Sequence, residues 1–163
     1  MARANRLPVL VCLVAGLLGL GRTSSARQVA VPLAERARMA ERVVVGRVAS
    51  VAPTWQVNEF GDRLIVSRLR ISVSETLKGQ ATSTVDVEVE GGTIGDVTLR
   101  VSDQVSLAPG ERAVFYINAT PRGTFTPHLR GHGVLKLDPT NKVTGSSLTL
   151  EHVRREVVAG RTR

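Results

Sequence analysis

Three histidines, His128, His132 and His152, are the residues of this 163-residue chain most able to bind a metal. Three residues separate His128 from His132, and on a helix this spacing places two imidazoles on one face, where they could hold zinc and activate water. Gly131 and Gly133 disfavour a helix at this position. The pattern therefore favours two loop histidines, and a metal-dependent hydrolase using His128 and His132 is kept as the enzymatic alternative.

A second candidate is acidic, because Asp86, Glu88 and Glu90 recur at every other position of one segment. Carboxylates of this kind could bind calcium, but alternating acids on a strand face more often meet arginine or water. The glycine-rich run 91–95 precedes an apolar alternating segment, so it lacks the helix N-terminus that a phosphate site requires. We expect a sharp bend or a β-bulge there.

Nucleophilic catalysis has no candidate in the sequence. There is no Gly-x-Ser-x-Gly motif, and the single cysteine, Cys12, lies in an apolar N-terminal run. One cysteine also excludes a disulfide framework and a cysteine-based zinc site. The sequence predicts no catalytic residue, no metal and no cofactor.

Trp55 and Phe60 are the candidate binding residues. Both fall in a polar segment, 52–63, that we expect to form a loop, and an aromatic side chain on a loop is often an anchor for a partner. The alternative is that they pack over one end of the domain. Aromatic residues make up only 3% of the chain, so a platform for stacking nucleic-acid bases is not expected.

The N-terminal segment 1–26 has the features of a secretory signal peptide. Arg3 and Arg6 precede the apolar run 7–20, and small residues lead to a cleavage site after Ala26. The apolar run would form a helix of about 21 Å, shorter than the roughly 30 Å hydrocarbon core, so we expect no integral membrane span in the mature chain. The prediction is an exported protein that is periplasmic, secreted or held in the cell envelope.

The basic net charge of +8 is concentrated at the ends of the chain. Cleavage would remove three arginines and no acid, which leaves +5. Residues 40–145 carry twelve basic and eleven acidic side chains, so the expected domain is close to neutral. Nucleic-acid binding needs a basic face on the folded body, and we predict none. Basic tails could instead hold a passive cell-envelope protein in place, which is a further alternative.

The periodicity of the mature chain predicts a mainly β domain over residues 33–145, after a linker over 27–32. Short strands separated by glycine-rich turns are typical of a sandwich or a barrel. A helix at each end would cap it, the second lying in a C-terminal segment, 146–163, that ends in a basic tail. The expected elements are a helix over 33–42, strands at 43–48, 64–75, 85–89, 97–101, 113–117, 124–126 and 133–137, and a helix from Ser146 or Ser147 to Val158.

Complementary charges predict that two of these strands form a hairpin. Arginines alternate along the outer face of 64–75, and acids alternate along 85–89. A hairpin would place Arg70 near Glu88 and Arg68 near Glu90, and each such pair contributes a few tenths of a kcal/mol.

Five segments occur together in this chain: MAERVVVGRV (39–48), VSETLKG (73–79), VDVEV (85–89), GG (91–92) and PGERAVFY (109–116). Their combination resembles small exported bacterial domains of uncharacterised type and, loosely, the netrin-like domain of the tissue inhibitors of metalloproteinases. It implies a small, closed oligonucleotide/oligosaccharide-binding (OB)-type β-barrel of about six strands, with a helix packed against it. The inhibitors chelate the protease zinc through an N-terminal cysteine; this chain would begin at Arg27 and has no cysteine after cleavage.

The sequence as a whole predicts an exported, non-enzymatic binding or accessory domain. The candidate partner is a secreted protein such as a zinc protease, and Trp55 and Phe60 are its candidate contacts. The alternatives are the hydrolase using His128 and His132 and the passive cell-envelope protein.

Overall fold

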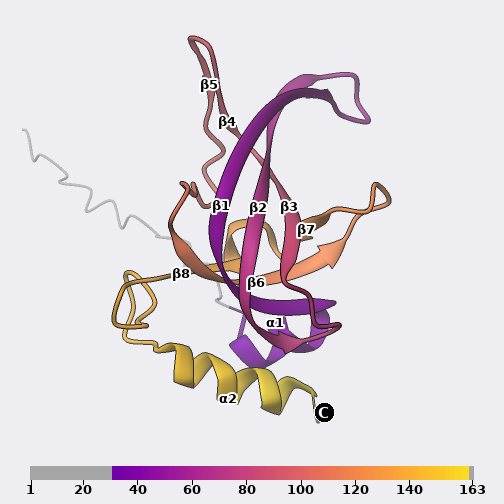
Figure 1. The fold of residues 1–163 in the computed structure, drawn as a ribbon. Helices are drawn as coiled ribbons and strands as arrows, with labels where there is room; N and C mark the ends of the chain where they lie inside the picture. Colours follow the sequence, from indigo (N-terminus) through magenta and orange to yellow (C-terminus); the bar gives the residue numbers. More distant parts are fainter. Residues whose placement is uncertain (1–30, 162–163) are drawn as a thin grey trace, which may run out of the picture.

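Eight strands and two α-helices make up residues 31–161, which are the residues that the structure, a computed structural model, describes (Figure 1). The protein is mainly β, as predicted. The predicted signal peptide, Cys12 and most of the predicted linker lie outside the described residues. The elements are α1 (Leu33–Met39), β1 (Arg42–Val57), β2 (Arg63–Lys78), β3 (Thr84–Glu90), β4 (Gly92–Ile94), β5 (Val97–Leu99), β6 (Arg112–Ala119), β7 (Phe125–Pro127), the 3₁₀ helix η1 (Arg130–Gly133), β8 (Val134–Leu137) and α2 (Leu150–Arg161).

The strand pairings follow a circuit that returns to β1. Six strands form one sheet in the order β1-β2-β3-β7-β6-β8, and β1 also pairs with β6. The pairings are antiparallel except for a single parallel pair, Val87 with Phe125, which joins β3 to β7. The first part of β1, up to Arg47, therefore has a neighbouring strand at both edges.

The predicted hairpin of arginine and acid strands is present as β2–β3, but its register differs by two residues. Arg70 lies opposite Asp86, and Arg68 lies opposite Glu88. Both Arg70 nitrogens that contact Asp86 are 2.9 Å from its carboxylate, and these hydrogen bonds lower the pKa of Asp86. The charge alternation could not fix the register, because a shift of two residues still places each of these arginines opposite an acid.

Side chains alternate along β1 and β6 between two apolar clusters, which is why both strands are apolar on both faces. Val45 and Tyr116 point toward the helices, whereas Val44 and Phe115 point to the other side of the sheet. The first cluster fills the space between the sheet and α1 and α2, which lie together below it in Figure 1. The second cluster lies on the other side of the sheet and includes Leu69, Ile71, Val87 and Ile117.

Lys78 fastens α1 to the end of β2. Its ammonium nitrogen donates to the carbonyl oxygens of Ala37, Arg38 and Ala40, at 2.7, 3.0 and 2.6 Å. These carbonyls lie at the C-terminal end of α1, where helix carbonyls have no partner within the helix and where a positive charge is favoured.

Replacing Lys78 by methionine is expected to lower the free energy of unfolding by about 2 kcal/mol, because three carbonyls at the end of α1 lose a charged donor. Urea unfolding at neutral pH measures the change. Lys142→Met is the matched control, since Lys142 is exposed. Equal stabilities of the two variants would contradict the role given to Lys78.

The expectation of a loop over 52–63 is wrong. The two strands continue into this segment and pair as far as Val57 with Arg63, so that only residues 58–62 form the turn. The polar composition of 52–63 suggested a loop, but it has another cause. This part of the β1–β2 hairpin extends beyond the body of the sheet and is solvated on much of its surface (Figure 1).

The C-terminal helix is present but begins later than predicted, at Leu150. Residues before it form bridges between Leu137 and Val143 and between Lys142 and Thr149. The hydroxyl of Thr149, not that of Ser146 or Ser147, accepts the backbone N–H of His152 at 3.3 Å and so caps the helix.

The glycine-rich run 91–95 makes a sharp change of direction, as predicted. Gly91 and Gly92 have φ angles of 107° and 138°, which residues other than glycine rarely adopt. The chain then forms β4 and β5, a short hairpin that projects from the sheet in Figure 1. Within residues 31–161, neither helix is long and apolar enough to span a membrane.

Candidate ligand-binding groove

The two aromatic residues predicted to bind a partner lie on the β1–β2 hairpin in different settings. Trp55 belongs to β1, opposite Ile65, and not to a loop as predicted. The guanidinium of Arg63 covers its ring at 4.4 Å from the centroid, a cation–π contact that leaves Trp55 38% exposed. Phe60 lies in the turn, is 81% exposed, and has the exposed Val57 nearby in the sequence.

The turn that carries Phe60 is held by one side chain. The Oδ1 atom of Asn58 accepts the backbone N–H groups of Phe60 and Asp62, at 3.0 and 2.8 Å. The backbone N–H of Asn58 donates to the carbonyl of Asp62 at 3.0 Å. An exposed phenyl ring on a turn ordered in this way loses little conformational entropy when it binds.

A groove of about 730 Å³ begins at this turn. Its apolar part is formed by Leu64, Val66 and Val89, from β2 and β3. The other wall comes from the β6–β7 turn, from Thr126 of β7, from Arg130 of η1 and from Gln104, which precedes β6. The lining residues are Gln56, Val57, Asn58, Glu59, Phe60, Leu64, Val66, Glu88, Val89, Glu90, Gln104, Thr120, Pro121, Arg122, Thr126 and Arg130.

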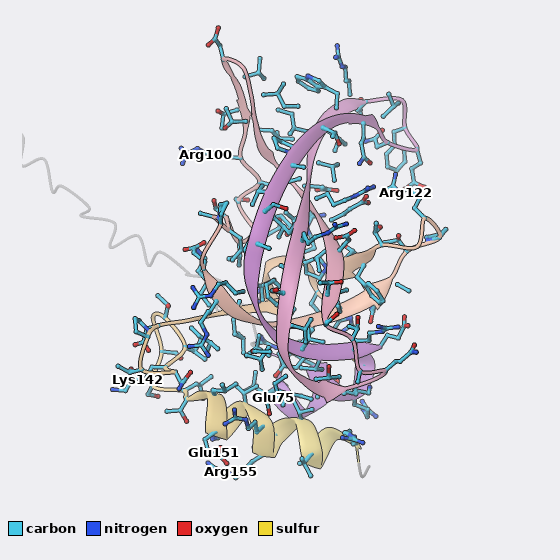
Figure 2. The ribbon with its side chains drawn as sticks, in the orientation of Figure 1. Glu75, Arg100, Arg122, Lys142, Glu151 and Arg155 are labelled. Carbon is cyan, nitrogen blue, oxygen red and sulfur yellow. The ribbon has the colours of Figure 1, made fainter. Side chains whose placement is uncertain are left out.

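Glu88 is the buried charge of the groove, with 5% of its side chain exposed. One carboxylate oxygen accepts Arg68 at 3.0 Å, and the other accepts Arg122 at 2.9 Å. Arg122 also donates to Gln56 at 3.0 Å. Figure 2 shows Arg122 beside the β1–β2 hairpin, although it comes from the β6–β7 turn. This arginine therefore joins both walls of the groove to β3.

Arg130 forms a second bridge at the same groove. It contacts Glu90 at 2.7 Å and Asp103 at 2.6 Å, and the hydrogen bond to Glu90 is the main cause of its raised pKa. Its backbone is left-handed, with a φ of 54°, and that of Leu129 is also left-handed. This conformation costs each of these residues about 1 kcal/mol. Together with the Arg70–Asp86 pair, the two bridges show that the alternating acids Asp86, Glu88 and Glu90 face arginines, which was the favoured interpretation.

Gln104 adds a polar atom in need of a partner. Its Oε1 atom is buried and has no hydrogen-bond partner among residues 31–161, although the residue lines the groove. A buried acceptor without a donor is costly, and a ligand N–H could supply one. Sequence reasoning missed Gln104, Arg122 and Arg130. The only available signal was that Glu88 and Glu90 needed cationic partners.

The candidate metal ligands do not come together as a site. The ring Nδ1 of His128 lies 3.1 Å from the amide nitrogen of Asn118, and its Nε2 is buried without a partner among residues 31–161. Burial lowers the pKa of His128, and the positive charge of Arg36 adds to this effect. His132 lies in η1, and His152 lies in α2 beside Glu156. Across residues 31–161, no three histidine, cysteine or acidic side chains are arranged to hold a metal ion.

Comparison with known proteins adds no relative to this description. No protein-family model matches the chain, and no curated protein matches it.

Proposed function

We propose that the chain is an exported, non-enzymatic binding domain that engages a partner protein through the groove and the Phe60 turn. The observation that carries the proposal is the exposed phenyl ring at the end of a groove whose two walls are joined by Arg122. An exposed apolar anchor beside fixed polar groups is the arrangement by which proteins recognise proteins.

The strand order supports this location for the site. We propose that the sheet is an OB-type barrel, because β1 pairs with both β2 and β6, and β3 is parallel to β7. In such barrels the ligand lies on the second and third strands, between the loops that follow the first and fourth strands. The groove occupies the corresponding place here, over β2 and β3 and between the β1–β2 and β6–β7 turns.

The charge of the groove favours a protein over a nucleic acid. Three acids, Glu59, Glu88 and Glu90, line it together with two arginines, Arg122 and Arg130. A polyanion requires an excess of basic groups, whereas a protein surface with mixed charges can match this arrangement. The proposed partner is a secreted protein, with a zinc protease as the first class to test.

Affinity capture from the exported fraction, followed by mass spectrometry and a direct measurement of affinity for the captured protein, tests the proposal. Changing both Val57 and Phe60 to serine is expected to weaken binding about thirtyfold, since loss of an anchor costs about 2 kcal/mol. Met39→Ser, at a residue that is 53% exposed elsewhere, is the matched control and should bind like the wild type. Equal affinities of the wild type, the double variant and Met39→Ser would show that the groove does not bind the partner.

A further inference from the structure

Arg36 is a buried cation without an acidic partner. The residue lies on α1 and is 7% exposed. Its Nε donates to the carbonyl oxygen of Val31 at 2.8 Å, and its Nη1 donates to that of His132 at 2.7 Å. No carboxylate of residues 31–161 lies within ion-pair distance of it, although ten ion pairs form elsewhere in this part of the chain.

The missing partner is significant because an arginine keeps its charge when buried. Burial lowers the pKa of Arg36, but not into a range where the guanidinium becomes neutral. Two carbonyl oxygens satisfy some of its N–H groups and leave its charge uncompensated. Buried charges in proteins are normally paired, because leaving one unpaired costs several kcal/mol.

Two further polar groups beside Arg36 also lack partners among residues 31–161. They are the hydroxyl of Tyr116, a residue with no exposed surface, and the Nε2 atom of His128. Burial raises the pKa of Tyr116 and lowers that of His128; the positive charge of Arg36 opposes the first shift and adds to the second, so all three groups share one electrostatic neighbourhood. A buried positive charge and two unsatisfied polar atoms therefore share this part of the interior, and the carboxylate of Glu156 also acts on Tyr116.

Arg36 lines a cavity of about 510 Å³ that lies between α1, η1, β8 and α2 and is open to solvent. This volume is in the range of small-molecule sites. Most of the wall is apolar and comes from Leu33, Val134, Leu135, Val143 and Leu148. The other charged or titratable lining residues are His132, His152 and Glu156; the last two are partly exposed and lie 3.9 Å apart.

We propose that this cavity binds an anionic amphiphile, a small molecule whose carboxylate pairs with Arg36 and whose aliphatic body lies against Leu135, Val143 and Leu148. The carboxylate supplies the charge that the described protein residues do not, and the aliphatic body covers apolar wall. The site shares no residue with the groove, so it stands independently of the proposed protein partner.

Calorimetric titration of the full chain with decanoate, and with decanol as its uncharged counterpart, tests the proposal. Decanoate is expected to bind at least tenfold more tightly than decanol, and Arg36→Met is expected to remove that difference. Arg100→Met, at an exposed arginine labelled in Figure 2, is the control and should bind decanoate like the wild type.

A second variant keeps the test decisive if Arg36→Met does not fold. Leu148→Trp places a larger side chain in the cavity and is expected to block decanoate while leaving the circular dichroism spectrum unchanged. Equal binding of decanol and decanoate by the wild type would overturn the proposal. So would undiminished decanoate binding by a folded Leu148→Trp variant, because the ligand would then lie elsewhere on the chain.

Discussion

Replacing Gly133 by alanine is expected to lower the free energy of unfolding by about 3 kcal/mol. A Cβ atom at this position would lie 2.2 Å from the carbonyl oxygen of His128, 2.8 Å from its nitrogen and 2.9 Å from the carbonyl oxygen of Tyr116. All three atoms belong to the backbone, so no side-chain rotation relieves the overlap. Overpacking of this kind costs about 1–3 kcal/mol and occasionally more.

Gly123→Ala is the matched control for Gly133→Ala. Gly123 has a φ of 77° in the β6–β7 turn, and a Cβ atom there would meet nothing within 4 Å. The control should therefore lose only about 1 kcal/mol, from the left-handed backbone alone. Urea unfolding of the two variants separates crowding from backbone strain. A smaller loss for Gly133→Ala than for Gly123→Ala would show that the chain near η1 is free to move apart.

The free energy of unfolding is expected to fall by about 2 kcal/mol between pH 10 and pH 12 because of Tyr116. Burial raises its pKa to about 12, an effect that Arg36 reduces and Glu156 reinforces. An unfolded tyrosine titrates near pH 10. Over this window the unfolded state loses its proton first, so rising pH favours unfolding. Below pH 10 both states are protonated, and the group has no effect on the pH dependence.

Tyr116→Phe isolates this contribution. The variant should lack this part of the alkaline loss, and it should be as stable as the wild type at pH 7 or about 1 kcal/mol more stable, because it removes a buried hydroxyl that has no partner among residues 31–161. The chain contains one tyrosine, so the absorbance of tyrosinate reports Tyr116 alone. Titration of the folded protein near pH 10 would contradict the burial of this hydroxyl.

Most of the fold could be predicted from local patterns. The apolar runs at Val43–Val48 and at 113–117 indicated strands buried on both faces, and these became the start of β1 and the centre of β6. The length of the β1–β2 hairpin was not predictable in this way, because its outer part is stabilised by backbone pairing and carries a polar sequence.

The candidate site was predicted only in part, for a physical reason. Phe60 was a candidate because it is an aromatic residue in a polar segment of a chain that has few aromatic residues. Arg122 and Arg130 could not, since their roles depend on contacts with Gln56, Glu88 and Glu90, which are 34 to 66 residues away along the sequence. The burial of Arg36 could not be predicted either, because it depends on how α1 packs against η1 and α2.

The pairing of β1 with β6 has a consequence for how the chain folds. Arg42 lies opposite Ile117, so this edge of the sheet forms only after most of the strands have been synthesised and brought together. The β1–β2 hairpin needs no such distant partner and can form early. Chains that depend on contacts of this sequence separation fold in milliseconds to seconds, not microseconds. Until β6 pairs with β1, its apolar residues 113–117 remain exposed. During this interval the chain is most open to aggregation and to capture by a chaperone.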